Sequence, residues 1–411
     1  LRRADPTLRV VVCERETVGF GASGRNGGWC SAFFAGARAA TEKRHGRDAV
    51  IAMQRACIAT LDEIEDVIGK EGIACDWARG GSLTVATLPA HRHRLEHSLA
   101  DHRSYGFGDA DWTWLDPPAA QARIGCTPNL GALATPHCAA IHPKKLVLAL
   151  GDVVDGTGVT IHEHTAVSAI EPHRVVTDHG VVRAEVVVRA TEAFTPDFEG
   201  DLHRALVPVY SLMIATEPLP ASFWAEAGLA DRATFADARH MVIYGQRTAD
   251  DRFAFGGRGA PYHFGSKVRS AYDTNARVFD AIEQTLRSLF PAMDGAVTHQ
   301  WGGAVAIPRD WYPSVGFDRA TGHACAGGYV GDGVAITNLA GRTLADLVLG
   351  HDTELTTLPW VGHRSPRWEP EPLRWAGINA GANLAASLDR AEASGRSARV
   401  RRRLAGALLG H

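Results

Sequence analysis

The 411-residue sequence lacks several features that mark familiar classes of protein. Its seven cysteines are odd in number and form no C-x-x-C pair, which argues against a disulfide framework or a zinc site. No apolar run reaches the roughly 18 residues that a membrane-spanning helix needs. The net charge of −3 gives no general attraction to nucleic acid or to an anionic membrane. These absences predict a cytoplasmic protein with no nucleic-acid partner and no integral membrane segment.

A Gly-rich phosphate loop is also absent from the place where the first strand pattern requires one. The β-branched run Val10 to Cys13 ends at Glu14, and an acid at this point of a dinucleotide-binding fold bonds the adenosine ribose. The fingerprint G-x-G-x-x-G belongs about 20 residues before that acid. Only 13 residues precede Glu14, and the first of them is Leu1. We therefore expect that the first strand and most of the first helix of such a fold are missing.

What is present directly after Glu14 is a loop with five glycines, Gly19 to Gly28. Glycines let backbone N–H groups approach a ligand closely, because no Cβ blocks them. A flexible surface loop is the alternative interpretation, but the strand and acid in front of it favour ligand contact. The candidate cofactor-binding residues here are Glu14, Arg15, Ala22, Ser23, Gly24, Arg25, Asn26 and Gly27.

A second Gly-rich turn, GGYVGDGV over residues 327–334, precedes a predicted helix from Ala335 to Leu349. A helix N-terminus offers free N–H groups and a partial positive charge, which stabilise negative charge on a bound cofactor. A tight turn into a packed helix is the alternative. The predicted strand 186–190 would return the chain to the nucleotide. These segments add the candidate cofactor-binding residues Val167, Ala190, Thr191, Gly328, Gly331, Asp332, Gly333 and Val334.

Strand patterns typical of a nucleotide domain occur at the start, in the middle and near residue 320, with antiparallel patterns between them. This order predicts an α/β (α+β) fold, in which a discontinuous Rossmann-like domain carries an inserted antiparallel-sheet domain. A helix is expected over 49–70 and a hairpin over 174–183. The predicted boundaries are 1–75, 136–205 and 306–352 for the nucleotide domain, 76–135 and 206–305 for the inserted domain, and 353–411 for a helical tail.

Seven segments together carry a resemblance to a known family. They are ERETVGFGASGRNGG (14–28), IHPKKL (141–146), VVVRATEAF (186–194), VPVYSLMIATEPL (207–219), FGGRGAPY (255–262), WGGAVAIPRDWYPSVG (301–316) and GGYVGDGVAITNLAGRTLADLVLG (327–350). The chain resembles the D-amino-acid-oxidase-like family of FAD-dependent oxidoreductases, and most of all its gamma-glutamylputrescine oxidase branch. The resemblance implies FAD, a substrate domain over the flavin, and oxidation of a carbon–nitrogen bond.

The family chemistry implied by this resemblance is hydride transfer from the substrate carbon to flavin N5, after which the imine is hydrolysed. The substrate would be a small amine or amino acid, and oxygen or another carrier would accept the electrons. Some relatives attach the flavin through a cysteine near the segment that matches 306–313, where this chain has none, so non-covalent FAD is expected. The candidate catalytic residues are Arg258, Tyr262, Trp301, Arg309 and Tyr329, with core packing or a surface ion pair as the alternative for each.

Two other functions compete with this interpretation. Without the phosphate loop, the chain would be a catalytically inactive fragment that cannot hold FAD. An NAD-dependent dehydrogenase is the weaker alternative, because the late Gly-rich turn argues against it. The pair His93 and His97 would share one helical face, but no Cys, Asp or Glu completes a persuasive cage, so no metal site is expected.

Overall fold

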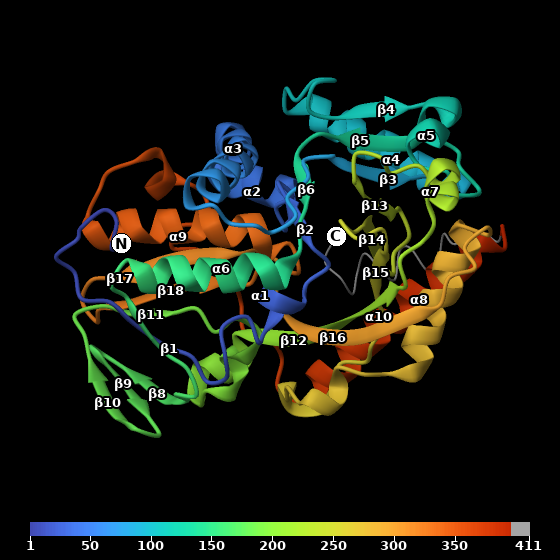
Figure 1. Ribbon diagram of the computed structural model, residues 1–411. Coiled ribbons are helices and arrows are strands. Elements are labelled where there is room, and N and C mark those ends of the chain that lie inside the picture. Colours follow the sequence, from blue (N-terminus) through green and yellow to red (C-terminus); the bar gives the residue numbers. More distant parts are fainter. Residues whose placement is uncertain (396–411) are drawn as a thin grey trace.

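The computed structural model describes residues 1–395, with the exception of the Arg258 side chain. Residues 396–411, the end of the predicted tail, lie outside the described part. Figure 1 shows two bodies side by side: small sheets with the helices α3, α6 and α9 form one, and a large sheet with α8 and α10 forms the other. Among residues 1–395, no helix is both long and apolar enough to cross a membrane.

The nucleotide side is assembled from strands far apart in the sequence. β1 (Val11–Cys13) pairs in parallel with β7 (Thr160–His162). β11 (Val187–Arg189) pairs in parallel with β18 (His323–Gly327), which pairs antiparallel with β17 (Ser314–Asp318). The predicted hairpin forms β9 (Arg174–Thr177) and β10 (Gly180–Arg183), which β8 (Val167–Glu171) extends.

The β1–β7 pair and the β11–β18–β17 sheet are separate, and no backbone ladder joins them within residues 1–395. Parallel strands are normally buried on both faces. Here Val11 is 45% exposed, Val12 is 40% exposed and Val188 is 42% exposed. These two small sheets therefore have apolar residues open to solvent.

Helices pack on these sheets through apolar faces. α3 (Arg47–Glu71) contains the helix expected over 49–70 and ends at Gly72, whose φ of +65° closes it in the left-handed region. α3 packs against α9 (Gly333–Leu349) around the buried residues Leu61 and Leu339. The other elements of this side are α1 (Ala22–Arg25), β2 (Trp29–Ser31), α2 (Arg38–His45), β6 (Cys138–Ala140), α6 (Pro143–Gly156), η1 (Glu192–Asp197), η2 (Gly200–Arg204) and η5 (Glu354–Thr357).

The other body is built on an eight-stranded sheet with the order β16-β12-β15-β14-β13-β3-β5-β4. All neighbours are antiparallel except β13 and β3. Its strands are β3 (Ser82–Val85), β4 (Thr113–Leu115), β5 (Ala132–Thr135), β12 (Leu206–Thr216), β13 (Thr234–Asp237), β14 (Ile243–Arg247), β15 (Phe253–Arg258) and β16 (Val297–Pro308). Its helices are α4 (Pro89–Ser104), α5 (Pro117–Arg123), α7 (Ala221–Ala227), η3 (Phe264–Ser266), η4 (Ser270–Tyr272), α8 (Ala276–Leu289) and α10 (Leu373–Ala393).

An aromatic core holds the large sheet against α7 and α8. Phe223, Phe235, Phe253 and Phe290 stack edge to face with centroids 5.6–6.5 Å apart, a separation at which aromatic pairs are favourable. The mixed α/β fold class predicted from the sequence is present, whereas the residue limits predicted for the two domains stay a prediction. The face of β12, β14 and β16 turned toward the nucleotide side frames the candidate site.

Candidate active site

The Gly-rich loop that follows β1 lies between the two bodies, where α1 contacts both α6 and β16 (Figure 1). Asn26 gives the loop its shape: its side-chain amide donates to the carbonyls of Ala22 and Ser23, both at 3.1 Å. Its Oδ1 accepts from the backbone N–H of Gly28 at 2.8 Å. Asn26 is therefore a cap for a one-turn helix.

Glycine at position 27 is required by a close approach. A Cβ on Gly27 would lie 2.5 Å from the Tyr244 ring on β14. Gln246, two residues further along β14, donates its side-chain N–H to the carbonyl of Gly27 at 2.8 Å and to that of Ile141 at 3.2 Å. The loop thus rests directly on the large sheet.

The second predicted segment lies beside the first. The Arg15 guanidinium stacks 4.5 Å from the centre of the Phe194 ring and forms an ion pair with Asp197 at 3.0 Å. Both partners belong to η1, which follows the candidate residue Thr191. The Thr191 hydroxyl in turn lies 2.9 Å from the hydroxyl of Thr195. The end of β1 and the end of β11 therefore converge.

Val167 lies at the start of β8, close to the acid at the end of β1. The backbone N–H of Thr165, two residues before Val167, donates to the Glu14 carbonyl at 2.8 Å. The Glu14 carboxylate accepts from the backbone N–H of Glu16 at 2.8 Å. This bond fixes the direction of the carboxylate at the strand end.

The third segment, the turn from β18 into α9, is tied to the second through Glu192. The Glu192 carboxylate accepts the backbone N–H of Tyr329 at 3.0 Å and that of Gly328 at 3.3 Å. On the far side of the turn, Asp332 Oδ1 lies 3.5 Å from the hydroxyl of Ser31, just after the Gly-rich loop. The three predicted cofactor segments therefore meet in one place.

Glu192 is a residue that the sequence analysis missed. It has a left-handed φ of +39°, and burial raises the pKa of its carboxyl to about 7 against the opposing effect of two N–H donors and Arg189. An acid in the apolar stretch VVVRATEAF was the available signal. Its partner Gly328 is 136 residues away in the sequence, so the contact could not be predicted from local patterns.

The large sheet contributes Trp301, which is a candidate catalytic residue, from β16. Its indole N–H donates to the backbone carbonyl of Arg25 at 2.9 Å. The Arg25 guanidinium forms an ion pair with Asp273 at 2.7 Å and donates to the Phe20 carbonyl, also at 2.7 Å. The Arg25 charge is thus balanced by Asp273, which precedes α8.

Four further residues outside the candidate set lie here: Ser211, Met213 and Tyr244 on the large sheet, and Trp29 on β2. The hydroxyls of Ser211 (β12) and Tyr244 (β14) are 2.7 Å apart, and the Tyr244 ring meets Trp29 edge to face at 6.3 Å. Met213 packs so close to Gly256 that a Cβ there would lie 2.1 Å from its sulfur. We call Trp29, Ser211, Met213, Tyr244 and Trp301 the aromatic face.

Two other candidate catalytic residues lie apart from the aromatic face. The buried Tyr262 hydroxyl bonds Ser266 at 2.8 Å and Glu371 at 3.1 Å. Arg309 pairs with Glu369 at 3.0 Å. Both side chains therefore contact the segment that leads into α10.

The last two catalytic candidates are placed differently. Tyr329 joins the site through its backbone N–H, while its ring is buried next to Gly333, and this burial raises its pKa. The backbone of Arg258 lies opposite Ser211 in the β12–β15 ladder. The Arg258 side chain is outside the described part of the chain.

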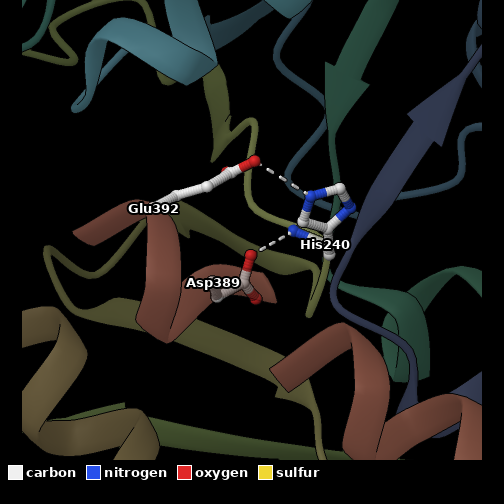
Figure 2. A group of neighbouring side chains, drawn as sticks. All are labelled: His240, Asp389 and Glu392. Atoms are coloured by element: carbon white, nitrogen blue, oxygen red, sulfur yellow. Dashed lines mark hydrogen bonds and ion pairs between the residues drawn. The ribbon is translucent and has the colours of Figure 1, made fainter. Parts of the chain in front are cut away.

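Figure 2 shows the one group of side chains in the described residues whose spacing would suit a metal ion: His240, Asp389 and Glu392. Each oxygen of Asp389 accepts a backbone N–H, from His240 and from Met241, at 2.8 Å. Both oxygens of Glu392 accept from the guanidinium of Arg94 at 2.9 Å. The carboxylate oxygens of Asp389 and Glu392 are thus already hydrogen-bonded, and the Arg94 guanidinium supplies the positive charge. These contacts anchor α10.

Nucleotide-type segments that converge opposite an antiparallel sheet define a dinucleotide-binding domain joined to a substrate-type domain. The chain belongs to the family of FAD-dependent oxidoreductases, whose family model matches residues 1–347. The family, the enzyme class and the FAD cofactor predicted from the sequence are thereby confirmed.

Two curated relatives agree with this family, and a solved structure matches the fold. The chain is 29% identical over 355 residues to the gamma-glutamylputrescine oxidoreductase of Escherichia coli, covering 85% of this chain and 80% of that protein. It is 28% identical over 370 residues to a probable oxidoreductase, OrdL, of Haemophilus influenzae, covering 87% and 81%. Glycine oxidase from Geobacillus kaustophilus matches the fold with a TM-score of 0.72 at 20% identity, over 88% of this chain and 94% of that one.

Proposed function

We propose that this protein oxidises a carbon–nitrogen bond of a small amine or amino acid, with FAD held non-covalently between the Gly-rich loop and the aromatic face. The main support for this proposal is the contact of that loop with Tyr244 and Trp301. The flavin of bound FAD supplies the oxidising chemistry by accepting a hydride from the substrate carbon. The imine product then leaves and is hydrolysed by water.

The residues present fit such a cofactor at both ends. Glu14, fixed by its own turn, suits a ribose, and the N-terminus of α9 supplies N–H groups for the electron-rich edge of a flavin. Hydrogen bonds and an ion pair hold the three segments next to one another. No cysteine occurs in 306–313, which supports non-covalent attachment.

The aromatic face supports an amine substrate. Its rings offer π-faces and apolar walls, and the Ser211–Tyr244 hydroxyl pair offers the polar atoms that orient an amine. The Arg25 charge is already balanced by Asp273, so Arg25 is not free to clamp a carboxylate. The relative named for gamma-glutamylputrescine favours the same class, an amine with a polar tail. The amine must be neutral to react, and these apolar walls lower its pKa.

A visible absorption spectrum tests the proposal. The purified chain is mixed with FAD, and free FAD is removed by gel filtration. Retained flavin bands that bleach with a member of an amine panel in the absence of oxygen support the function. Readmission of oxygen then separates an oxidase, which recovers its colour, from an enzyme that needs another acceptor. A colourless protein supports the alternative, a chain that cannot hold FAD.

A further inference from the structure

Glu192 has a buried carboxyl group and lies between two stretches of candidate cofactor-binding residues. It directly follows Ala190 and Thr191, and its carboxylate reaches across to the turn that begins at Gly328. Part of the residue is still accessible to solvent, although the surrounding protein encloses its carboxylate.

The carboxylate occupies a position suited to an anion. Backbone N–H groups at the turn from a strand into a helix bind phosphates and other anions. Here the N–H groups of Gly328 and Tyr329 are held by Glu192 itself, at 3.3 Å and 3.0 Å. The chain thus places its own negative charge beside the predicted cofactor site.

No neighbouring group neutralises that charge directly. No cation of the described side chains lies within ion-pair distance of Glu192. The guanidinium of Arg189 on β11 acts on Glu192 electrostatically, and it donates to the hydroxyl of Thr195. Asp197, which lies in η1 together with Glu192, forms an ion pair with Arg15.

Ionisable groups also face Glu192 from the β18 side, and burial lowers the pKa of His323 on that strand. The Tyr329 phenol is buried and its pKa is raised, so it stays neutral. Cys325 acts on Tyr329 from β18, and Asp332 lies by Ser31 on the far side of the turn. Burial raises the pKa of the Glu192 carboxyl to about 7, so its ionisation changes near neutral pH.

We propose that Glu192 couples FAD binding to the uptake of one proton: its ionised carboxylate repels the diphosphate-bearing cofactor, and its protonated form admits it. This inference rests on the proposed function, because FAD is the ligand. The phosphates of FAD and its flavin ring keep the same charge between pH 6 and 8. A pH dependence in this range therefore reports on the protein.

Titration of the apoprotein with FAD, followed by quenching of flavin fluorescence, tests the proposal. We expect the Kd of the wild type to rise about fivefold to tenfold from pH 6 to pH 8. Glu192→Gln and Glu192→Gly are expected to bind FAD with a Kd that changes less than about twofold. Glycine suits the left-handed φ at this position, so the second variant avoids backbone strain.

Asp389→Asn is the matched control, because Asp389 also accepts two backbone N–H groups but lies in α10 (Figure 2). It should keep the wild-type pH dependence. An equal pH dependence in wild type and both Glu192 variants would overturn the proposal. Absence of FAD binding at every pH would instead overturn the proposed function, and this inference with it.

Thermal melting of the apoprotein gives a second readout that needs no cofactor. The folded pKa of Glu192 is raised above that of an unfolded glutamate, so the folded state loses stability as pH rises from 5 to 8. The melting temperature of the wild type should therefore fall relative to Glu192→Gly over this range. Parallel curves for the two proteins would contradict the proposal.

Discussion

The indole N–H of Trp301 donates to the backbone carbonyl of Arg25 at 2.9 Å, across 276 residues of sequence. This bond fastens β16 of the large sheet to the one-turn helix in the Gly-rich loop. The two halves of the candidate site are thus held together by a side chain that also lies on the aromatic face. Disturbing Trp301 should affect cofactor retention as well as substrate binding.

Trp301→Phe keeps an aromatic ring but removes the hydrogen bond to Arg25. The loss of one such bond costs about 1 kcal/mol, so the Kd for FAD should rise about fivefold. Fluorescence titration measures this change. Trp375→Phe in α10, where Trp375 is 44% exposed, is the control and should bind FAD like the wild type. Equal affinity of the two variants would show that the bond does not support the cofactor site.

Gly27→Ala should impair the site by displacing the Tyr244 ring. The new Cβ would lie 2.5 Å from a ring carbon, well inside van der Waals contact, and Tyr244 must move away from Ser211. We expect turnover to fall at least about tenfold, since small misplacements at a reacting centre are costly. Gly108→Ala, where the Cβ meets nothing within 4 Å, is the control. Unchanged steady-state kinetics for Gly27→Ala would refute this reading of the aromatic face.

Acid should destabilise the protein through His102. This side chain stacks on Trp112 at 3.8 Å, and burial together with the Arg38 charge lowers its pKa to about 3. The unfolded state then binds a proton between pH 6.5 and 3 that the folded state does not, so stability falls as pH falls through this window. At pH 5 the free energy of unfolding is lowered by up to about 2 kcal/mol through this group.

His102→Gln should remove part of this acid sensitivity, as measured by urea unfolding at pH 5 and pH 7.5. His93→Gln, an exposed change on the same helix, serves as the control and should leave the difference between the two pH values unaltered. If His102→Gln retains the full wild-type difference, another group is responsible for acid destabilisation.

Divalent metals should not stabilise the group formed by His240, Asp389 and Glu392. The oxygens of its carboxylates already accept backbone and guanidinium N–H groups. We expect zinc or EDTA to shift the melting temperature by less than about 1 °C, because a ligand that does not bind the folded state cannot stabilise it. A zinc-dependent rise that Glu392→Gln abolishes would establish a metal site here.

Local signals predicted much of the scaffold. The hairpin at 174–183 and the helix that Gly72 terminates follow from turn chemistry and periodicity, which involve neighbouring residues. The fold class and the FAD family followed from several segments taken together. The hairpin and the helix end are each encoded within a short stretch of sequence, whereas the family emerges only from the combination of segments.

The roles of individual side chains were harder to predict, because their partners lie far along the chain. Tyr262 and Arg309 occur in segments that resemble the family, but their partners, Glu371 and Glu369, are in the segment before α10. Glu192 follows the strand predicted over 186–190, and its two N–H partners come from the β18–α9 turn. Sequence order alone does not indicate which of these groups meet.

The separation of the β1–β7 pair from the β11–β18–β17 sheet bears on how the protein opens in solution. No amide of one sheet is protected by a carbonyl of the other in residues 1–395, so either sheet can open while the other stays closed. Amide hydrogens of β1 and β7 should then exchange with deuterium independently of those in β11 and β18. Slow, concerted exchange would belong to the eight-stranded sheet, which carries the aromatic face.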